Sequence, residues 1–291
     1  MMKKLRPGLA AGLLFAAGVW ADTTWIGGLN KQLTNSAYWT RGQLPVDGVM
    51  GQIGRDGHIS IYSRFPGWTV TQTGGMLLNN SNAITLNGGV KWFLQGGSLV
   101  SPKNHIRIGF MEAGAVTGAE MTMTGGMLEG GRQLQVTEGC FVQGGGTLKF
   151  GQSAVMINGS TVDVSGGTGA FNTIGTESTN GMTLAGSGTL VTFSGGAWTV
   201  KGNLQFGTNL RSVAMRFAAG NGELTADSIS FLSGGYIDFT EGSGGKLTIK
   251  SCKAADFEKL WSRGKIWVNG AVPRGSFSDL FAVEGNTLRL K

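Results

Sequence analysis

Apolar and polar residues alternate along this chain in short segments that end in Gly-Gly and begin again on an apolar residue. The segment Thr122–Leu128 (TMTGGML) is the clearest example, and it repeats Thr71–Leu77 (TQTGGML) 51 residues earlier. A period of two places successive side chains on opposite faces of an extended strand. Reuse of one such segment is typical of a solenoid, in which a single supersecondary unit recurs along the chain.

The repeat extends on both sides of this segment. Residues 68–100 and 119–148 are predicted to be two copies of one unit, and the segment that starts at Phe93 (FLQGG) is echoed by the one that starts at Phe141 (FVQGG). The distance between the copies drifts from 51 to 50 to 48 residues. Loops of slightly different length on one strand framework produce such a drift.

The Gly-Gly pairs set the size of the repeating unit. The pairs that mark successive units begin at residues 74, 96, 125, 144, 166, 195 and 234. Intervals of about twenty to thirty residues suit one coil of a three-sided parallel β-helix, the last interval of 39 residues suits two coils, and glycine suits the corners. Met76 and Met127 are then expected on the same side of the solenoid, two coils apart, each after a Gly-Gly corner.

Composition agrees with this interpretation. The 291 residues include 52 glycines and only 14% charged residues, which disfavours a helical bundle and favours many short strands joined by turns. We therefore predict an all-β fold, a right-handed, three-sided parallel β-helix over residues 52–250, between an N-terminal cap at 22–51 and a C-terminal cap segment at 251–291.

The predicted N-terminal cap is rich in aromatic residues. Trp25, Trp39, Gly42 and Pro45 follow the spacing W-x13-W-x2-G-x2-P. Large aromatic side chains and irregular loops suit the first coil of a solenoid, which has no neighbour on one side. The pattern resembles the opening of secreted bacterial proteins with autotransporter-associated β-strand repeats, although Tyr38 stands where those proteins usually have Asn.

The predicted C-terminal cap changes character. Residues 254–261 have helical periodicity with Gly264 as a stop, and strands are expected at 265–268 and 287–290. The pattern F..LW..G.I.V.G, followed by GNTL.L, is similar to the C-terminal segment of secreted repeat proteins of Verrucomicrobia and Lentisphaerae. The two resemblances imply a pectin-lyase-like architecture, and the C-terminal one carries no known chemistry.

Residues 1–21 have the pattern of a bacterial secretory signal peptide. Lys3, Lys4 and Arg6 precede the apolar stretch Leu9–Val19, and Ala21 suits a cleavage site. A retained membrane anchor is the alternative interpretation of this stretch. No later stretch is apolar for long enough to span a bilayer, so we expect a secreted or cell-surface protein.

Charge and cysteine content narrow the function classes. Cleavage after residue 21 removes three basic residues and lowers the formal net charge from +7 to +4. The remaining Lys and Arg residues are scattered along the sequence. The low charge and this scatter disfavour nucleic-acid binding.

Cys140 and Cys252 are the only cysteines. If coils rise by about 4.8 Å, the two lie too far apart for a disulfide, and both are expected to be small buried residues.

Candidate chemistry is sparse. A polysaccharide lyase needs clustered carboxylates for Ca²⁺ and a hydrolase needs two carboxylates roughly 5 to 10 Å apart, but most acidic residues here stand singly along the sequence. Two carboxylates from different coils could still meet on one face. His58 and His105 form no zinc-ligand spacing. No catalytic, cofactor-binding or metal-binding residue is predicted, and enzymatic activity is left open as the less favoured alternative.

Trp68, Trp92, Trp198 and Trp267 are the remaining candidates, because an exposed aromatic ring on a flat β face can stack on a sugar. Trp92 and Phe93 point to opposite faces of one strand, so one of them should point outward, and Trp92 is the candidate glycan contact. The sequence thus favours a non-catalytic, secreted solenoid with a structural or adhesive role. The alternatives are a polysaccharide lyase or hydrolase and a glycan-binding module, with extracellular polysaccharide or cell-surface components as partners.

Overall fold

The computed structural model covers the repeat region and the C-terminal segment. It describes residues 23–25, 49–53, 59–63, 69–72, 76–78, 83–87, 89–109, 118–174, 180–207, 213–232 and 234–291. The predicted signal peptide and most of the predicted N-terminal cap, including Trp39 and Pro45, lie outside these residues.

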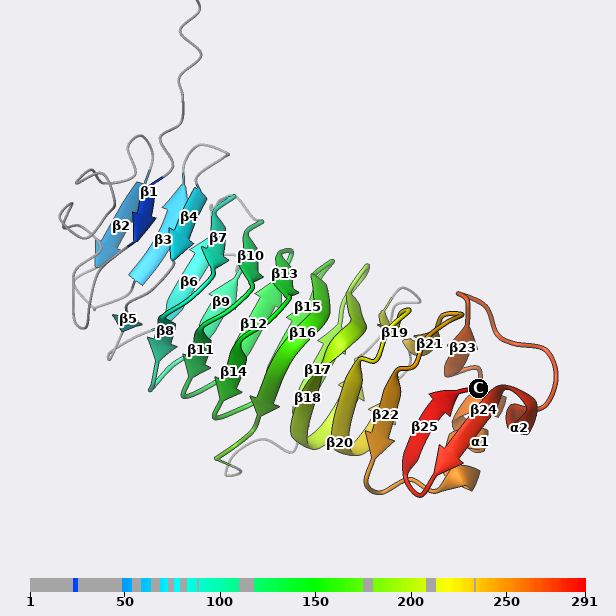
Figure 1. Ribbon diagram of the computed structural model, residues 1–291. Helices are drawn as coiled ribbons and strands as arrows, with labels where there is room; N and C mark the ends of the chain where they lie inside the picture. The colour runs from blue at the N-terminus through cyan, green and yellow to red at the C-terminus, as the bar shows by residue number, and fades with distance from the viewer. Residues whose placement is uncertain are drawn as a thin grey trace, which may run out of the picture.

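The described chain forms a β-solenoid, in which strands of successive coils lie side by side and parallel (Figure 1). Each coil contributes three short strands separated by corners, so the solenoid has three faces. This confirms the predicted all-β, three-sided parallel β-helix. Among the described residues, no helix is long and apolar enough to cross a bilayer.

The three faces are defined by their strand pairing. The first face consists of β1 (Thr23–Trp25), β4 (Thr69–Gln72), β7 (Lys91–Leu94), β10 (Glu120–Met123), β13 (Cys140–Gln143), the first parts of β16 (Thr161–Phe171) and β18 (Leu190–Phe206), β19 (Ala214–Phe217), β21 (Tyr236–Phe239) and β23 (Ile266–Val268). The second consists of β5 (Met76–Leu78), β8 (Ser98–Ser101), β11 (Met127–Gly130), β14 (Thr147–Phe150), the later part of β16, the middle of β18, the first part of β20 (Glu223–Phe231) and β22 (Lys246–Ile249). The third consists of β3 (Ile59–Ser63), β6 (Ile84–Asn87), β9 (Ile106–Ile108), β12 (Leu134–Thr137), β15 (Ala154–Ile157), β17 (Asn180–Ala185) and the ends of β18 and β20, with β2 (Val49–Ile53) antiparallel to β3.

The register confirms the predicted relation between the two methionines. Met76 pairs with Ser98, which pairs with Met127, so the two methionines occupy the same position of the second face two coils apart. Coil length varies: Glu120 pairs with Cys140 20 residues later, but with Lys91 29 residues earlier. The drift that the sequence shows is therefore a drift in loop length on a constant strand framework.

One predicted correspondence is wrong by one residue. Phe93 and Phe141 were expected to be equivalent, but Trp92 is in register with Met121 and Phe141, while Phe93 is in register with Val142. A one-residue slip moves a side chain to the other face of the sheet. Phe141 accordingly points into the core, whereas Phe93 lies on the outer surface and is half-buried.

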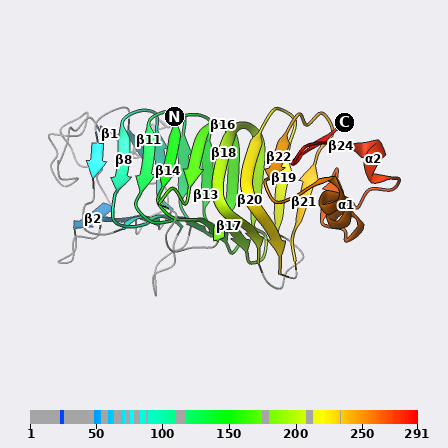
Figure 2. The same cartoon turned by 90° about the horizontal axis from the view of Figure 1, so that it is seen from below.

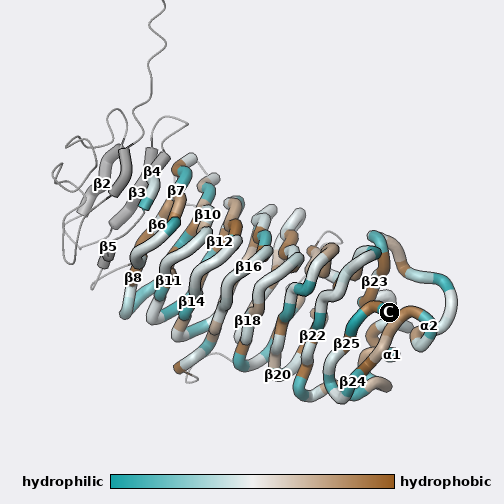
Figure 3. Tube along the Cα trace, in the orientation of Figure 1, coloured by the Kyte–Doolittle hydropathy of each residue, from teal (hydrophilic) through white to brown (hydrophobic). Residues whose placement is uncertain are grey.

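The core is a column of apolar side chains that stack on their equivalents in the next coil. Phe193, Phe217 and Phe239 form one such column, with ring centroids 5.6 Å and 4.9 Å apart and nearly parallel planes. All three are fully buried. Hydrophobic and hydrophilic residues accordingly alternate along each coil instead of gathering in one segment (Figure 3).

Glycine is needed at the corner between the first and second faces. A Cβ on Gly125 would lie 2.3 Å from the carbonyl oxygen of Gln95, and Gly126 has a φ of +72° with Gly97 O only 2.5 Å from where its Cβ would be. The first glycine thus permits a close approach between coils and the second permits a left-handed backbone. Gly234–Gly235, by contrast, precedes β21 at a different corner.

The C-terminal segment contains the predicted helix and two strands, which are helix α1 (Ala254–Ser262), β23 and β25 (Thr287–Leu290). Helix α2 (Phe277–Leu280) and strand β24 (Phe281–Glu284), which were not predicted, lie between β23 and β25, and β24 forms an antiparallel hairpin with β25. The carboxylate of Asp256 accepts the Lys253 N–H at 2.9 Å at the start of α1. Strand β25 pairs antiparallel with β22, so the hairpin joins the second face at the C-terminal end (Figure 2).

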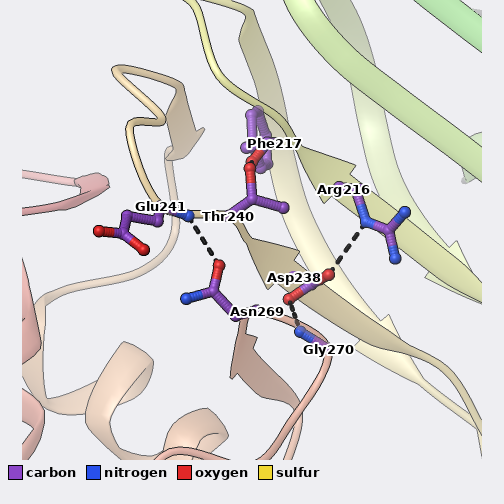
Figure 4. Close-up of polar contacts among 7 residues, drawn as sticks. All are labelled: Arg216, Phe217, Asp238, Thr240, Glu241, Asn269 and Gly270. Atoms are coloured by element: carbon purple, nitrogen blue, oxygen red, sulfur yellow. Dashed lines mark hydrogen bonds and ion pairs between the residues drawn. The ribbon is translucent and has the colours of Figure 1, made fainter.

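A buried carboxylate attaches this segment to the first face. Asp238 in β21 is fully buried, accepts a 3.0 Å bond from Arg216 Nε and accepts the Gly270 N–H at 2.9 Å (Figure 4). Asn269 in the same turn accepts the Glu241 N–H at 2.8 Å. The ion pair therefore serves the fold, because both carboxylate oxygens of Asp238 are used within the protein.

Candidate functional site

Trp92 does not offer its ring to a ligand in this structure. Its side chain is 1% exposed and lies in the core between the coils of β4 and β10. The physical reason is the register of the first face, in which the second and fourth residues of each strand point inward and the first and third point outward. The outward member of the pair is Phe93, so the expectation that Trp92 is the exposed residue is corrected.

The other candidate tryptophans are also used within the fold. Trp198 is 1% exposed, and its Nε1–H donates to Gln143 Oε1 at 2.7 Å. Trp267 is half-buried on the first face, where it stacks on Tyr236 with ring centroids 3.8 Å apart and donates to Gly264 O at 2.8 Å. Trp68 lies outside the described residues.

A furrow runs along the corner between the third and first faces. Five successive coils place a residue with positive φ at this corner: Gly89 (+77°), Gly118 (+91°), Glu138 (+51°), Gly159 (+75°) and Gly188 (+75°). Gly89, Gly118, Glu138 and Gly159 line a cavity of about 430 Å³ at this corner, because three of these four residues have no side chain to fill it. Glu138 is the only one of the five that presents a side chain there, and that side chain is exposed.

Residues of the first face line one wall of the furrow. Lys91, Glu120, Cys140 and Thr161 occupy the same strand position in four successive coils, and Lys91 Nζ lies 3.0 Å from a carboxylate oxygen of Glu120. Cys140 is half-buried and faces outward, which corrects the expectation that it is a core residue, whereas Cys252 is buried. Both thiols are free.

The electrostatics of the furrow disfavour a reactive thiolate. Burial, followed by the nearby carboxylates of Asp163 and Glu120, raises the pKa of the Cys140 thiol. Glu120 and Glu138 do line one cavity, as carboxylates from different coils were expected to be able to do. Within the described part of the chain, however, no three His, Cys, Asp or Glu side chains are grouped as a metal site requires.

The third face carries a second polar cluster, which we call the third-face patch. It comprises side chains from the coils of β9 and β12: Lys103, His105, Arg107, Arg132, Gln133 and Gln135. Arg107 Nε donates to Gln135 Oε1 at 2.9 Å, Gln135 Nε2 donates to Gln133 Oε1 at 2.7 Å, and Gln133 Nε2 donates to Ser153 Oγ at 3.0 Å. Hydrogen bonds thus link three successive coils, from the half-buried Arg107 and Gln135 to the buried Ser153.

His105 is the titratable group of this patch. Its Nδ1 accepts the Gln133 N–H at 3.4 Å. Burial, followed by the positive charges of Arg107 and Arg132, lowers its pKa from 6.5 to about 4. The imidazole is therefore neutral at physiological pH. His58, the other histidine, lies outside the described residues.

Charge is unevenly distributed between the faces. On the first and second faces, lysines and carboxylates of neighbouring coils are paired: Lys91 with Glu120, Lys149 with Glu129, and Lys246 with Glu223. By contrast, residues 101–109, 130–137 and 150–157 of the third face and its preceding corner contain three cations and no Asp or Glu. Lys103 and Arg132 are exposed and form no ion pair with a described residue.

Sequence reasoning noticed His105 and Arg107 but not the patch. The missing signal is their separation from Gln133 and Gln135, which is 28 residues in both cases and equals one coil at this point of the solenoid. Coil lengths vary from 20 to 29 residues. A separation of 28 residues therefore identifies neighbours on adjacent coils only when the strand register is known.

Comparison with protein families, with curated proteins and with solved structures finds no match for this chain.

Proposed function

We propose that this chain is a secreted, non-catalytic β-solenoid that acts outside the cell as a structural or adhesive element. Extracellular polysaccharide or cell-surface components are its proposed partners. The observation that carries the proposal is the third-face patch, in which donors and acceptors from successive coils are held in fixed positions on an outer face. Arginine and amide side chains arranged in this way suit a ligand that presents many hydroxyl or acidic oxygens.

The elongated shape supports the same function. A solenoid of stacked coils offers extended faces, and the side chains on them recur at intervals of about 4.8 Å along the axis. A polymer can contact such a face at many weak points, and the summed contacts give useful affinity. Export by the N-terminal segment is part of the proposal, and sequencing the N-terminus of the protein recovered from the culture medium or cell surface tests it.

A polysaccharide lyase or hydrolase is the second candidate. The furrow favours it, because Glu120 and Glu138 line one cavity of a size that accepts a sugar ring. Release of reducing or unsaturated sugars from a broad polysaccharide panel, abolished by Glu138→Gln, would support this candidate over the first.

Retention on immobilised polysaccharides tests the proposed function. Chain lacking residues 1–21 is passed over neutral and acidic polysaccharides and over intact bacterial cells. Retention on at least one of these surfaces without turnover of the polysaccharide is expected. If the chain binds none of the polysaccharides and none of the cell types, the adhesive role is refuted.

A further inference from the structure

We propose that the third-face patch is a binding site for acidic polysaccharide, a chain that carries carboxylate or sulfate groups. The proposal rests on the proposed function and deepens it by naming the ligand chemistry and the face that binds. The ligand chain would run along the solenoid axis, across the coils of β9, β12 and β15.

The first argument is the unbalanced charge. Lys103 and Arg132 stand in segments that contain no acidic residue, whereas Lys91, Lys149 and Lys246 of the other two faces lie within 3.3 Å of a carboxylate. Lys103 and Arg132 form no ion pair with a described residue, and their positive charges on adjacent coils repel each other. An acidic ligand would supply an anion, and the exposed heads of Lys103 and Arg132 are free of the desolvation that burial would cost.

The second argument is the direction of the hydrogen bonds. Neutral His105 accepts at Nδ1 from the Gln133 N–H, so its single proton must lie on Nε2. This assignment follows from the hydrogen-bond network. His105 thus contributes a donor that the Gln133 contact does not use. Together with the guanidinium of Arg132 and the ammonium of Lys103, the patch presents donors, which suits ligand oxygens.

The third argument is spacing. The Arg132 N–H donates to Asn104 O at 3.1 Å, and the Gln152 N–H donates to Arg132 O at 3.2 Å, so residues 104, 132 and 152 stack in successive coils. Lys103 and Arg132 are therefore separated by about one coil, roughly 4.8 Å along the axis. Two acidic groups on neighbouring sugars of a polymer can therefore contact Lys103 and Arg132 at the same time.

A polysaccharide suits this surface better than a nucleic acid does. Single strands are bound by aromatic side chains on which bases stack, and duplexes by dense arrays of cations. Residues 101–109, 130–137 and 150–157 contain one aromatic residue, Phe150, which is fully buried. Within these three segments the surface is therefore polar and rich in donors, and no exposed aromatic side chain offers a stacking platform.

Binding to polygalacturonate and to heparin, with dextran as the neutral chain and duplex DNA as the competing polyanion, tests the proposal. The chain without residues 1–21 is compared with the double variant Lys103→Gln/Arg132→Gln. The matched control, Lys149→Gln/Lys246→Gln, removes the same two charges from the second face, where both lysines are exposed and paired. Circular dichroism confirms that each variant is folded.

We expect at least one acidic polysaccharide to bind, the third-face variant to weaken this binding roughly tenfold, and the control to change it less than twofold. Equal weakening by both variants would mean that net charge alone acts, and tighter binding of duplex DNA would indicate a different ligand class; either result overturns the proposal. Retention on dextran or cells, with no preference for acidic chains, would overturn it while leaving the adhesive function standing. Absence of retention on every surface would instead refute both.

Discussion

The Trp198 indole N–H donates a 2.7 Å hydrogen bond to Gln143 Oε1, which joins two side chains 55 residues apart inside the solenoid. Both residues are almost completely buried. Gln143 Nε2 also donates to Thr168 O at 3.1 Å, so this single amide connects three coils. A polar side chain in an apolar column is tolerated here because both ends of the amide have partners.

Replacement of Gln143 by methionine should therefore destabilise the protein. The substitution keeps the side-chain length but leaves the Trp198 N–H and the Thr168 carbonyl without this partner, and we expect a loss of roughly 2 kcal/mol in the free energy of unfolding. Urea denaturation measures it. Gln95→Met, at an exposed position before the same type of corner, is the control and should change stability by less than about 0.5 kcal/mol. Equal stability of the two variants would contradict the assignment.

The corner glycines should differ in how much they tolerate alanine. Gly159 has a φ of +75°, and its nearest neighbour lies 3.6 Å from the position of an added Cβ, so Gly159→Ala should cost only the left-handed conformation, about 1 kcal/mol. Gly126→Ala combines positive φ with a 2.5 Å approach to Gly97 O and should cost roughly 3 kcal/mol or more. Thermal unfolding ranks the two, and a milder effect at Gly126 would show that this corner can relax.

Stability should fall in acid through His105. Its folded pKa of about 4 lies below 6.5, so between these pH values the unfolded chain binds a proton that the folded chain does not. The contribution is constant above pH 6.5 and is lost as the pH falls toward 4. His105→Gln should flatten the stability profile in this window.

Arg132→Gln should raise the pKa of His105, because it removes one of the two cations that lower it. NMR titration of the imidazole protons measures this, and the His105→Gln spectrum assigns the signal. Lys149→Gln, on the second face, is the matched control. An unchanged pKa in Arg132→Gln would show that Arg132 does not act on His105 and that burial and Arg107 set its pKa.

The Cys140 thiol should react slowly although it is partly accessible. Its raised pKa keeps the thiolate fraction low, and thiolate is the nucleophile. Asp163→Asn removes a negative charge that raises this pKa, so we expect alkylation by iodoacetamide at pH 8 to accelerate about twofold. Peptide mass spectrometry measures the rate, with Asp279→Asn in α2 as the control. Identical rates would indicate that access, not charge, limits the reaction.

The fold was readable from the sequence because its determinants are local. Period-two alternation and Gly-Gly corners identify a solenoid from any few coils, and the helix before Gly264 was placed correctly by its own periodicity. The orientation of Trp92 was not readable, because matching Phe93 to Phe141 instead of Trp92 to Phe141 reverses which residue points inward.

The third-face patch was beyond sequence reasoning for a different reason. Arg107 and Gln135 become neighbours only through a coil of 28 residues, while the coil that leads from Glu120 to Cys140 has 20. When the register is unknown, several residues at similar distances along the sequence could equally be the neighbour of Arg107 on the next coil. Polar contacts between coils therefore depend on loop lengths, whereas the apolar column depends only on alternation.

The pairing of Glu120 with Cys140 makes one coil a removable module. Excision of residues 120–139 would connect Ala119 to Cys140, a junction that keeps the order of the three faces and leaves the strands on either side in parallel register. A gene for such a protein can thus lengthen or shorten the display surface in steps of one coil by duplication or deletion. The length of the solenoid can therefore change from one gene to another while the fold of each coil stays the same.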